Sequence, residues 1–160
     1  ILEPGKEEDL LPFYKLLKER YLAQNKKLPV SYNYLFSIYK TFVDNKIIFY
    51  KIMYNRKMIG GAIKLVFKNT LYDWLGHPKI NALGGSPNDY LHYHIIQYGY
   101  KNDIKNYFII GADTQTISRF KSRYNGELIP HYSIIKKNSF LKITENIFLQ
   151  LRYAKNFVST

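Results

Sequence analysis

The sequence predicts an α/β (α+β) fold: a mixed, largely antiparallel sheet with helices on both faces. Three apolar runs of strand character follow one another between residues 47 and 76 with only short turns between them, which is typical of antiparallel strands. A helix, a short apolar run and a second helix come next. A strand–helix–strand crossover of this kind adds a parallel strand to the same sheet.

Two amphipathic helices precede the strands. The first is predicted over residues 6–24, where apolar side chains recur at helical spacing and three acidic residues fill the first turn, a position that the helix dipole favours. Ser31 is a suitable N-cap for the second helix, which continues to Phe42. Each helix has one apolar face, which it needs to pack on the sheet.

The three strands are predicted from their β-branched and aromatic composition. The first runs from Ile47 to Tyr54, its antiparallel partner from Met58 to Phe67, and the third from Thr70 to Gly76. Gly60 and Gly61 lie inside the second strand, where glycine indicates a bulge or close packing rather than a phosphate-binding loop.

A loop and a capped helix follow the third strand. Residues 77–85 show no periodicity, and Ser86 and Pro87 then provide an N-cap and a first helical residue. We expect the inward face of this helix to consist of Tyr90, Leu91, His94, Ile95 and Tyr98.

A short strand and another helix come next. Residues 107–110 are all apolar, as in a strand covered on both faces. Asp113 or Thr114 is the predicted N-cap of the following helix, and Asn125 with Gly126 suits its left-handed C-cap. The residues expected to face inward from this helix are Ile117, Phe120 and Tyr124.

The end of the chain is predicted as a strand over residues 128–135 and an amphipathic helix capped by Thr144. No internal repeat or linker is visible. We therefore interpret residues 1–160 as a single domain, either complete or cut from a longer chain, since the first residue is Ile1 rather than methionine.

Composition restricts the function classes. The formal net charge of +12 favours a polyanionic partner such as nucleic acid or a phosphorylated cofactor, although A/T-rich codon usage could also supply the lysines. The absence of cysteine excludes disulfides, thiolate metal sites and a cysteine nucleophile. No apolar run is long enough to span a membrane and no signal peptide is visible, so we expect a cytoplasmic protein. The oligomeric state is left open.

Common catalytic motifs are missing. His92 and His94 are two residues apart on a predicted helix and point in different directions, so no metal site is expected. The sequence contains no HExxH motif and no glycine-rich nucleotide-binding motif. Gly84, Gly85 and Ser86 offer free backbone N–H groups at a helix N-terminus, which can bind an anion; the alternative is an ordinary helix cap.

Several short segments together resemble the GNAT-type acyltransferase domain of FemAB-like proteins. The matching residues are Ile59–Ile63, Trp74–Gly76, Pro87–Leu91, Ile110–Asp113 and Phe120–Tyr124. The resemblance implies an N-acyltransferase that moves an acyl group from an acyl-CoA donor, such as acetyl-CoA, to an amine on a small molecule or a polymer. It implies no metal.

The chain also departs from the family pattern. Asp113 ends the segment Gly111–Asp113 where the family often has two glycines, and Asn125 replaces a glycine, which left-handed geometry tolerates. An apolar residue replaces the aspartate that opens the strand in the family. The pyrophosphate loop common in acetyl-CoA-dependent GNAT enzymes is absent, which leaves the donor in doubt.

The resemblance also assigns site residues. Phe120 and Lys121 match a phenylalanine–lysine pair near the donor, whose lysine is thought to steady the developing oxyanion; without the resemblance, Lys121 reads as a solvated lysine and Phe120 as core. Residue chemistry adds Asp113, at the end of the short strand, and Tyr124, which could protonate a leaving thiolate if the donor is a CoA thioester; the alternative for Tyr124 is packing. The catalytic candidates are therefore Lys121, Phe120, Asp113 and Tyr124. The donor-binding candidates are Gly84, Gly85, Ser86, Asn88 and Arg119. Candidates for a general base, each weak, are Asp113, His94 and Glu127.

Two alternatives stay open beside the acyl-CoA donor. The first is a FemAB-type aminoacyltransferase that takes its donor from tRNA, which the positive charge favours. The second is a non-catalytic module that keeps the fold to bind nucleic acid or another polyanion, with the 16 tyrosines available for stacking.

Overall fold

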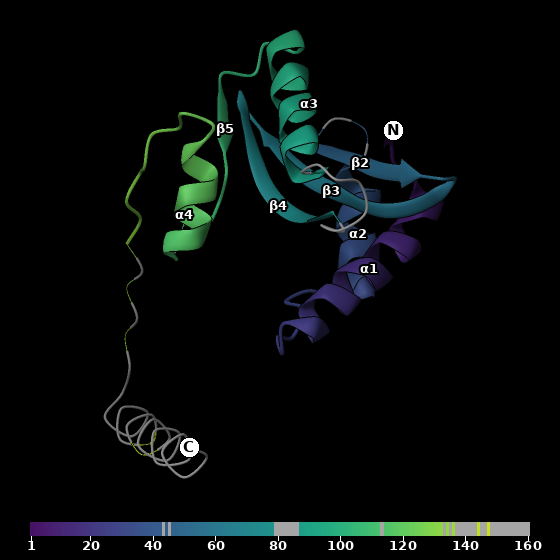
Figure 1. Ribbon diagram of the computed structural model, residues 1–160, viewed down its shortest axis with the longest axis horizontal. Coiled ribbons are helices and arrows are strands. Elements are labelled where there is room, and N and C mark those ends of the chain that lie inside the picture. The colour runs from purple at the N-terminus through teal and green to yellow at the C-terminus, as the bar shows by residue number, and fades with distance from the viewer. Residues whose placement is uncertain are drawn as a thin grey trace. The chain divides into compact units, whose positions relative to one another are not determined.

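The structure is a computed structural model that describes residues 1–42, 44, 46–78, 87–112, 114–132, 134, 136, 144 and 147. The chain forms two units, residues 1–123 and residues 124–160. The first unit holds the sheet and its helices; Figure 1 labels α1 to α4 and β2 to β5. Its elements are β1 (Leu2–Pro4), the 3-10 helix η1 (Glu7–Asp9), α1 (Leu10–Ala23), α2 (Tyr32–Phe42), β2 (Ile47–Tyr54), β3 (Lys57–Phe67), β4 (Thr70–Pro78), α3 (Pro87–Lys101), β5 (Asn106–Phe108) and α4 (Gln115–Ser122).

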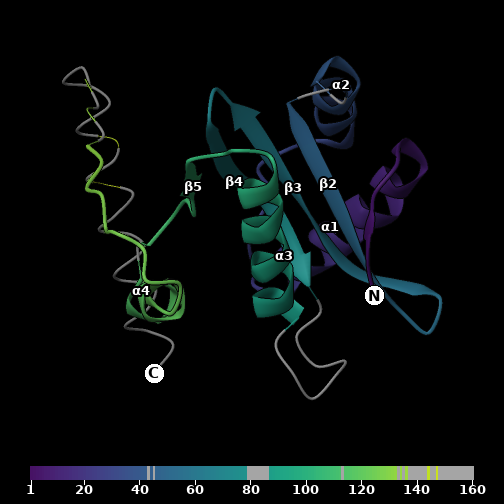
Figure 2. The ribbon, with the colours of Figure 1, turned by 90° about the horizontal axis from the view of Figure 1, so that it is seen from above.

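The sheet is mixed and largely antiparallel, as predicted. Its strand order follows the chain from β1 to β5, and Figure 2 shows β2 to β5 lying side by side with α3 across one face. The first three pairings are antiparallel. The pair β4–β5 is parallel, because the connection through α3 returns the chain to the end of the sheet at which β4 begins.

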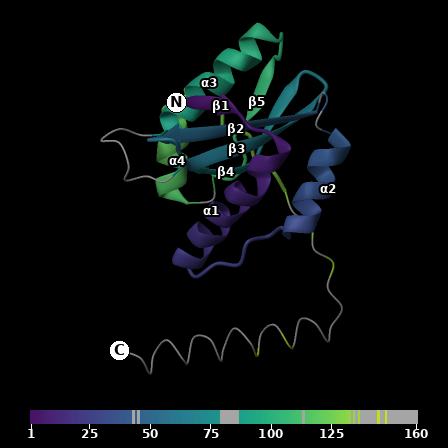
Figure 3. The same cartoon turned by 90° about the vertical axis from the view of Figure 1, so that its right-hand side faces the viewer.

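Helices cover both faces of the sheet, which confirms the predicted architecture. Figure 3 shows α1 and α2 on one side and α3 on the other. The core under α1 and α2 consists of Leu10, Phe13, Leu17, Leu35, Tyr39, Ile47, Phe49, Ile63 and Leu75. The core under α3 consists of Ile52, Ile59, Ala62, Leu71, Leu91 and Ile95. Successive residues of β3 alternate between these two cores, as the pleat of a strand requires.

The structure shows both features predicted for Gly60 and Gly61, a bulge and close packing. The register between β2 and β3 shifts at this point and leaves Ile59 as an extra residue, which is a β-bulge. A Cβ at Gly61 would lie 2.6 Å from the carbonyl oxygen of Tyr50 and 3.2 Å from the Phe13 ring. The helix α1 therefore packs directly on a strand that has no side chain at this position.

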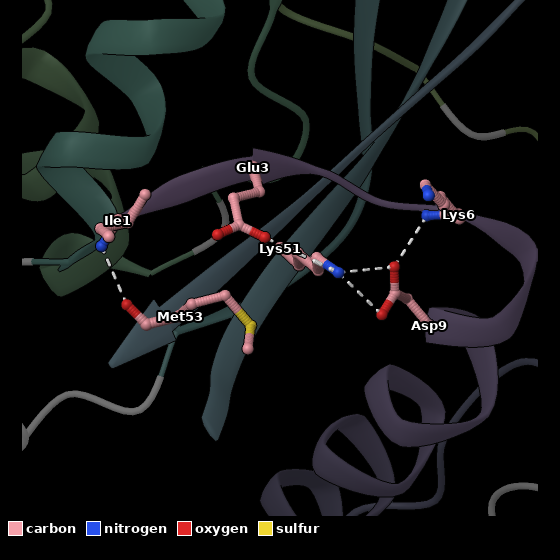
Figure 4. Close-up of polar contacts among 6 residues, drawn as sticks. All are labelled: Ile1, Glu3, Lys6, Asp9, Lys51 and Met53. Atoms are coloured by element: carbon pink, nitrogen blue, oxygen red, sulfur yellow. Dashed lines mark hydrogen bonds and ion pairs between the residues drawn. The ribbon is translucent and has the colours of Figure 1, made fainter. Parts of the chain in front are cut away.

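Sequence patterning missed β1, because three residues ending in proline show no alternation. β1 pairs with β2, and the terminal amine of Ile1 donates to the carbonyl oxygen of Met53 at 2.8 Å. Figure 4 shows the adjacent ion pair, in which Lys51 of β2 donates to both carboxylate oxygens of Asp9 at 2.9 and 3.0 Å. This contact joins β2 to the start of α1.

Two predicted caps are confirmed. Ser31 Oγ accepts from the Tyr34 N–H at 3.2 Å at the start of α2. Thr114 Oγ1 accepts from the Ile117 N–H at 3.4 Å at the start of α4. Asn125 has a φ of 51°, the left-handed conformation predicted for it. Both helices therefore begin at the positions that their polar N-caps indicate.

The predicted inward face of α3 is wrong by about one residue of rotation. Leu91 and Ile95 are buried as expected, but His92 and Gly99 are buried beside them while Tyr90 is exposed. His92 is accepted in the core because its ring bonds to a tyrosine of β5. Gly99 lies against Leu71, and a Cβ there would make an ordinary van der Waals contact at 3.5 Å.

Two predictions for the later strands are also wrong. β5 is not covered on both faces, because Phe108 is 39% exposed and the helix α4 buries none of its residues, Ile117 included. The described residues between 128 and 134 form no strand; their alternation permits pairing, but a strand also needs a partner. The helix predicted after Thr144 lies outside the described residues, except that Thr144 and Ile147 are helical.

We predict that Gly61→Ala destabilises the protein by about 1–3 kcal/mol, because the new Cβ meets the backbone of β2 and the Phe13 ring. The free energy of unfolding in urea measures this. Gly76→Ala is the matched control, since a Cβ at Gly76 would find its nearest neighbour at 3.7 Å. Equal effects of the two substitutions would contradict the close packing.

Candidate active site

The pairing of β4 with β5 is short. It consists of the pairs Thr70–Asn106, Leu71–Tyr107 and Tyr72–Phe108. We call the last pair, Tyr72–Phe108, the branch point. β4 continues beyond it to Pro78 and stays paired with β3. Among the described residues, the edge of β4 after the branch point therefore has no strand neighbour on the β5 side.

A bulge lies immediately after the branch point. The register between β3 and β4 runs from Lys64–Asp73 to Ile63–Leu75, so Trp74 is an extra residue on β4. A bulge bends its strand and increases the local twist. A bend at this position accounts physically for the end of β4–β5 pairing directly after Tyr72.

The chain direction brings two helix N-termini to the same end of the sheet. β4 and β5 are parallel, so the C-terminal ends of both strands lie at that end. α3 is the next described element after β4, and α4 follows β5. The N-terminal end of a helix carries partial positive charge and free N–H groups. This end of the sheet therefore favours binding of an anion.

A buried ion pair lies beside the branch point on the α3 face of the sheet. Lys64 of β3 donates to Oδ1 of Asp73 on β4. The Lys64 side chain is 1% exposed and the Asp73 side chain 21%. Burial lowers the pKa of Lys64, and the neighbouring Asp73 carboxylate opposes that shift. The ammonium also lies 5.8 Å from the centre of the Tyr107 ring.

A second buried polar pair adjoins the first. The hydroxyl of Tyr107 on β5 and Nδ1 of His92 on α3 lie 2.8 Å apart in a hydrogen bond. Burial, followed by the charge of Lys64, lowers the pKa of His92 to about 4. His92 is therefore neutral at pH 7 and serves as a hydrogen-bonding partner rather than a cation.

Lys121 of α4 reaches back to the end of β5. Its ammonium donates to the carbonyl oxygens of Ile109, at 3.2 Å, Ile110 and Gly111. An ammonium has three N–H donors, so these three carbonyls match its donor capacity in this conformation. Lys121 thus fixes the backbone that follows β5. To hold an oxyanion it would have to exchange one of these carbonyls for it.

One face of α4 carries a basic, partly aromatic depression of about 330 Å³. Its lining residues are Gln115, Thr116, Arg119, Phe120 and Arg123. Arg123 lies over the Phe120 ring at 6.0 Å. The Phe120 ring also packs against the His92 ring, with ring centres 6.1 Å apart. The inner wall of the depression therefore touches α3.

The structure brings together some of the predicted site residues. Phe120, Lys121 and Arg119 all lie on α4, and Asn88 lies half-buried in the first turn of α3. Tyr124 is half-buried at the start of the second unit. The remaining predicted residues lie outside the described part of the chain: Gly84, Gly85, Ser86 and Asp113.

The candidate bases His94 and Glu127 lie on α3 and in the second unit, respectively. The His94 ring packs edge-on against Tyr90 with 4.5 Å between ring centres, and Glu127 is exposed in the second unit. Sequence reasoning missed Lys64, Asp73 and His92. Lys64 and Asp73 are charged residues inside otherwise apolar strands, and that contrast could have identified both.

No group of three or more His, Cys, Asp or Glu side chains that could hold a metal ion occurs among the described residues. Within the same part of the chain, no helix combines the length and apolar character that crossing a bilayer requires.

Solved structures share this architecture. A predicted acetyltransferase from Clostridium acetobutylicum, solved with acetyl-CoA, superposes with a TM-score of 0.69 at 8% identity, over 85% of this chain and 95% of that one. The fold is that of the GNAT acetyltransferases. No protein-family model matches the sequence, and no curated protein matches it.

Two further structural neighbours with this fold were solved with sisomicin or with a CoA–acetylneamine bisubstrate analog. The aminoglycoside acetyltransferase meta-AAC0020, from an uncultured soil metagenomic sample and solved with sisomicin, gives a TM-score of 0.64 at 15% identity, covering 86% of this chain and 96% of that one. AAC(6')-Iy, in complex with a bisubstrate analog, gives 0.62 at 11% identity, with 86% and 97% covered. At these identities the likeness is one of fold.

We predict that the protein loses stability as pH falls from 6.5 to 4 because of His92. An unfolded histidine takes up its proton near pH 6.5 but folded His92 only near pH 4, so acid favours the unfolded state. The loss amounts to about 3 kcal/mol at most. Urea unfolding at several pH values measures it, and His92→Phe should remove this part of the slope. Titration of the His92 ring near pH 6.5 by NMR would contradict the assignment.

Proposed function

We propose that this protein is an N-acyltransferase that moves an acyl group from an acyl-CoA-type donor to an amine acceptor. The observation that carries the proposal is the end of β4–β5 pairing at the branch point, beside a basic face of α4. The GNAT fold, shared with an acetyltransferase solved with acetyl-CoA, supports it.

The free edge of β4 suits the extended arm of the donor. Strand edges bind extended molecules through backbone N–H and C=O groups, and the arm of coenzyme A contains amides that can pair in this way. Backbone N–H groups at this edge are also suitable donors to the oxygen that becomes negative as an amine attacks a thioester carbonyl. Positioning the two reactants together supplies much of the remaining rate enhancement.

The basic residues of α4 suit the phosphates of the donor. Arg119 and Arg123 line the same depression, and a guanidinium pairs with a phosphate through two parallel hydrogen bonds. The N-terminus of α3, where Asn88 lies, adds a second favourable site for negative charge. The residues predicted just before it, Gly84 to Ser86, are part of the same proposal.

Lys121 is proposed to position the site by holding the carbonyls that follow β5. Phe120 is proposed to form the wall between the donor and α3. The sequence suggested two further candidates, Asp113 as a general base and Tyr124 as a proton donor to a leaving thiolate. The acceptor is proposed to be a small-molecule or polymer-borne amine, such as the aminoglycoside bound by one structural neighbour.

We test the proposal by calorimetric titration of the protein with acetyl-CoA and with tRNA at two salt concentrations. We expect acetyl-CoA to bind with a Kd of about 1 μM to 1 mM and little dependence on salt. Silence toward acetyl-CoA together with steeply salt-dependent tRNA binding would contradict it, and would favour an aminoacyl-tRNA donor or a polyanion-binding module.

Turnover is measured as release of the CoA thiol with a panel of amines: sisomicin, spermidine, glucosamine and tyramine. Because the chain has no cysteine, a thiol reagent reports the product without background from the protein. Release that depends on an amine of the panel identifies the acceptor class.

We predict that Arg119→Ala and Arg123→Ala each weaken acetyl-CoA binding by about tenfold, since each removes a charge-assisted hydrogen bond to phosphate. Arg56→Ala is the control, because Arg56 is an exposed arginine in the turn between β2 and β3. Unchanged affinity in both α4 variants would place the phosphates elsewhere.

A further inference from the structure

We propose that Lys64, held by Asp73, is the group that gives a proton to the thiolate leaving the donor. This inference rests on the proposed acyltransferase function and adds a catalytic residue to it. It starts from a charged side chain in an unusual place. Lys64 and His92 are the buried polar or charged residues among the described part of the chain, and Lys64 is 1% exposed.

The position of the ammonium is well defined by its contacts. Asp73, its partner, is the first residue of β4 after the branch point. Tyr107, whose ring it faces at 5.8 Å, is the residue of β5 just before the branch point. The ammonium therefore lies between the side chains of the two strands at the point where their pairing ends.

A continuous series of contacts joins this ammonium to the proposed donor site. Tyr107 bonds to His92, His92 packs against Phe120, and Phe120 lines the basic depression on α4. A donor whose phosphates contact α4 and whose arm follows the edge of β4 would bring its sulfur toward the branch point. Within this series, Lys64 is the buried group that can donate a proton from a charged state.

Stability alone does not account for the pair. Burying two charges costs as much as their attraction returns, and replacing such a pair by apolar residues is often neutral or stabilising. A buried, shifted titratable group beside an unpaired strand edge is the arrangement expected of a functional site.

The acid strength also shifts in the direction that the step needs. Burial lowers the pKa of Lys64 below that of an ordinary lysine, which makes its ammonium a stronger acid. The charged group that acts on Lys64 is Asp73 from β4, and its ammonium faces the Tyr107 ring from β5. The charges that act on the adjacent His92 of α3 are Lys64, Asp73, Asp89 from α3 and Lys121 from α4. His92 is too weak a base at neutral pH to hold a proton for this purpose.

The reaction balances without any further reagent. The amine nitrogen bonds to the acyl carbon, and the carbon–sulfur bond breaks with its electron pair going to sulfur. The sulfur takes the proton of Lys64, while the amine loses one proton to water. Lys64 then regains a proton from solvent through the side of Asp73, which is 21% exposed.

The test compares Lys64→Met and Lys64→Arg with the wild type. Thiol release from acetyl-CoA is measured with water as the acceptor and with the fastest amine of the panel as the acceptor. Arginine keeps the charge but cannot release its proton at useful pH. We expect kcat to fall by about 100-fold or more in both variants, with the acetyl-CoA Kd changed by less than about threefold. Lys51→Met, which removes another strand lysine paired with an aspartate (Figure 4), should leave kcat unchanged.

The pH profile separates proton donation from a structural role. Donation requires charged Lys64, so wild-type kcat should fall as pH rises toward 10.5, and the ratio of wild-type to Lys64→Met kcat should fall with it. The ratio cancels the ionisation of the acceptor amine. The double variant Lys64→Met/Asp73→Leu, which leaves no unpaired charge, is used if the single variant does not fold.

The proposal would be overturned if the kcat of Lys64→Met equalled that of the wild type. It would also be overturned if the ratio of wild-type to Lys64→Met kcat did not depend on pH. Loss of the alkaline fall in Tyr107→Phe rather than in the Lys64 variants would assign the proton to Tyr107 instead. Failure of the wild type to bind acetyl-CoA would instead overturn the proposed function, so the two failures are distinguishable.

Discussion

Backbone hydrogen bonding between β4 and β5 stops after three residue pairs, and the functional interpretation depends on where it stops. The bulge at Trp74 bends β4 at this position while β3 keeps its other edge paired. Unpaired backbone groups cost free energy in a buried setting, so an edge of this kind is kept where a partner supplies the missing hydrogen bonds. An extended acyl donor with amide groups is such a partner, and the GNAT fold of the structural neighbours is consistent with it.

The charged groups around the branch point follow one physical pattern. On the outside, Arg119 and Arg123 offer solvated positive charge to phosphates. On the inside, Lys64 and His92 are buried, and desolvation lowers the pKa of each. Lys121 lies between these regions and binds the carbonyls after β5. Arg119 and Arg123 thus contribute part of the net positive charge at the place where a phosphorylated donor is proposed to bind.

The sequence predicted the sheet and both helix layers because strand composition, helix spacing and polar N-caps such as Ser31 and Thr114 are local signals. It failed where non-local contacts decide the outcome. His92 is buried because Tyr107, 15 residues away, supplies its hydrogen bond, whereas helical spacing alone favoured His94. The Lys64–Asp73 pair depends on strand register, which composition does not determine. Phe120 and Lys121 were identified by resemblance, and their functional roles, like that of Arg119, are proposals.

The most direct test of this account is a crystal structure of the protein with acetyl-CoA bound. The account predicts the pantetheine arm along the β4 edge beyond Tyr72, phosphate oxygens within hydrogen-bonding distance of Arg119 and Arg123, and the sulfur within about 4 Å of Lys64 Nζ. Coenzyme A bound away from the branch point, or a sulfur separated from Lys64 by the sheet, would contradict it.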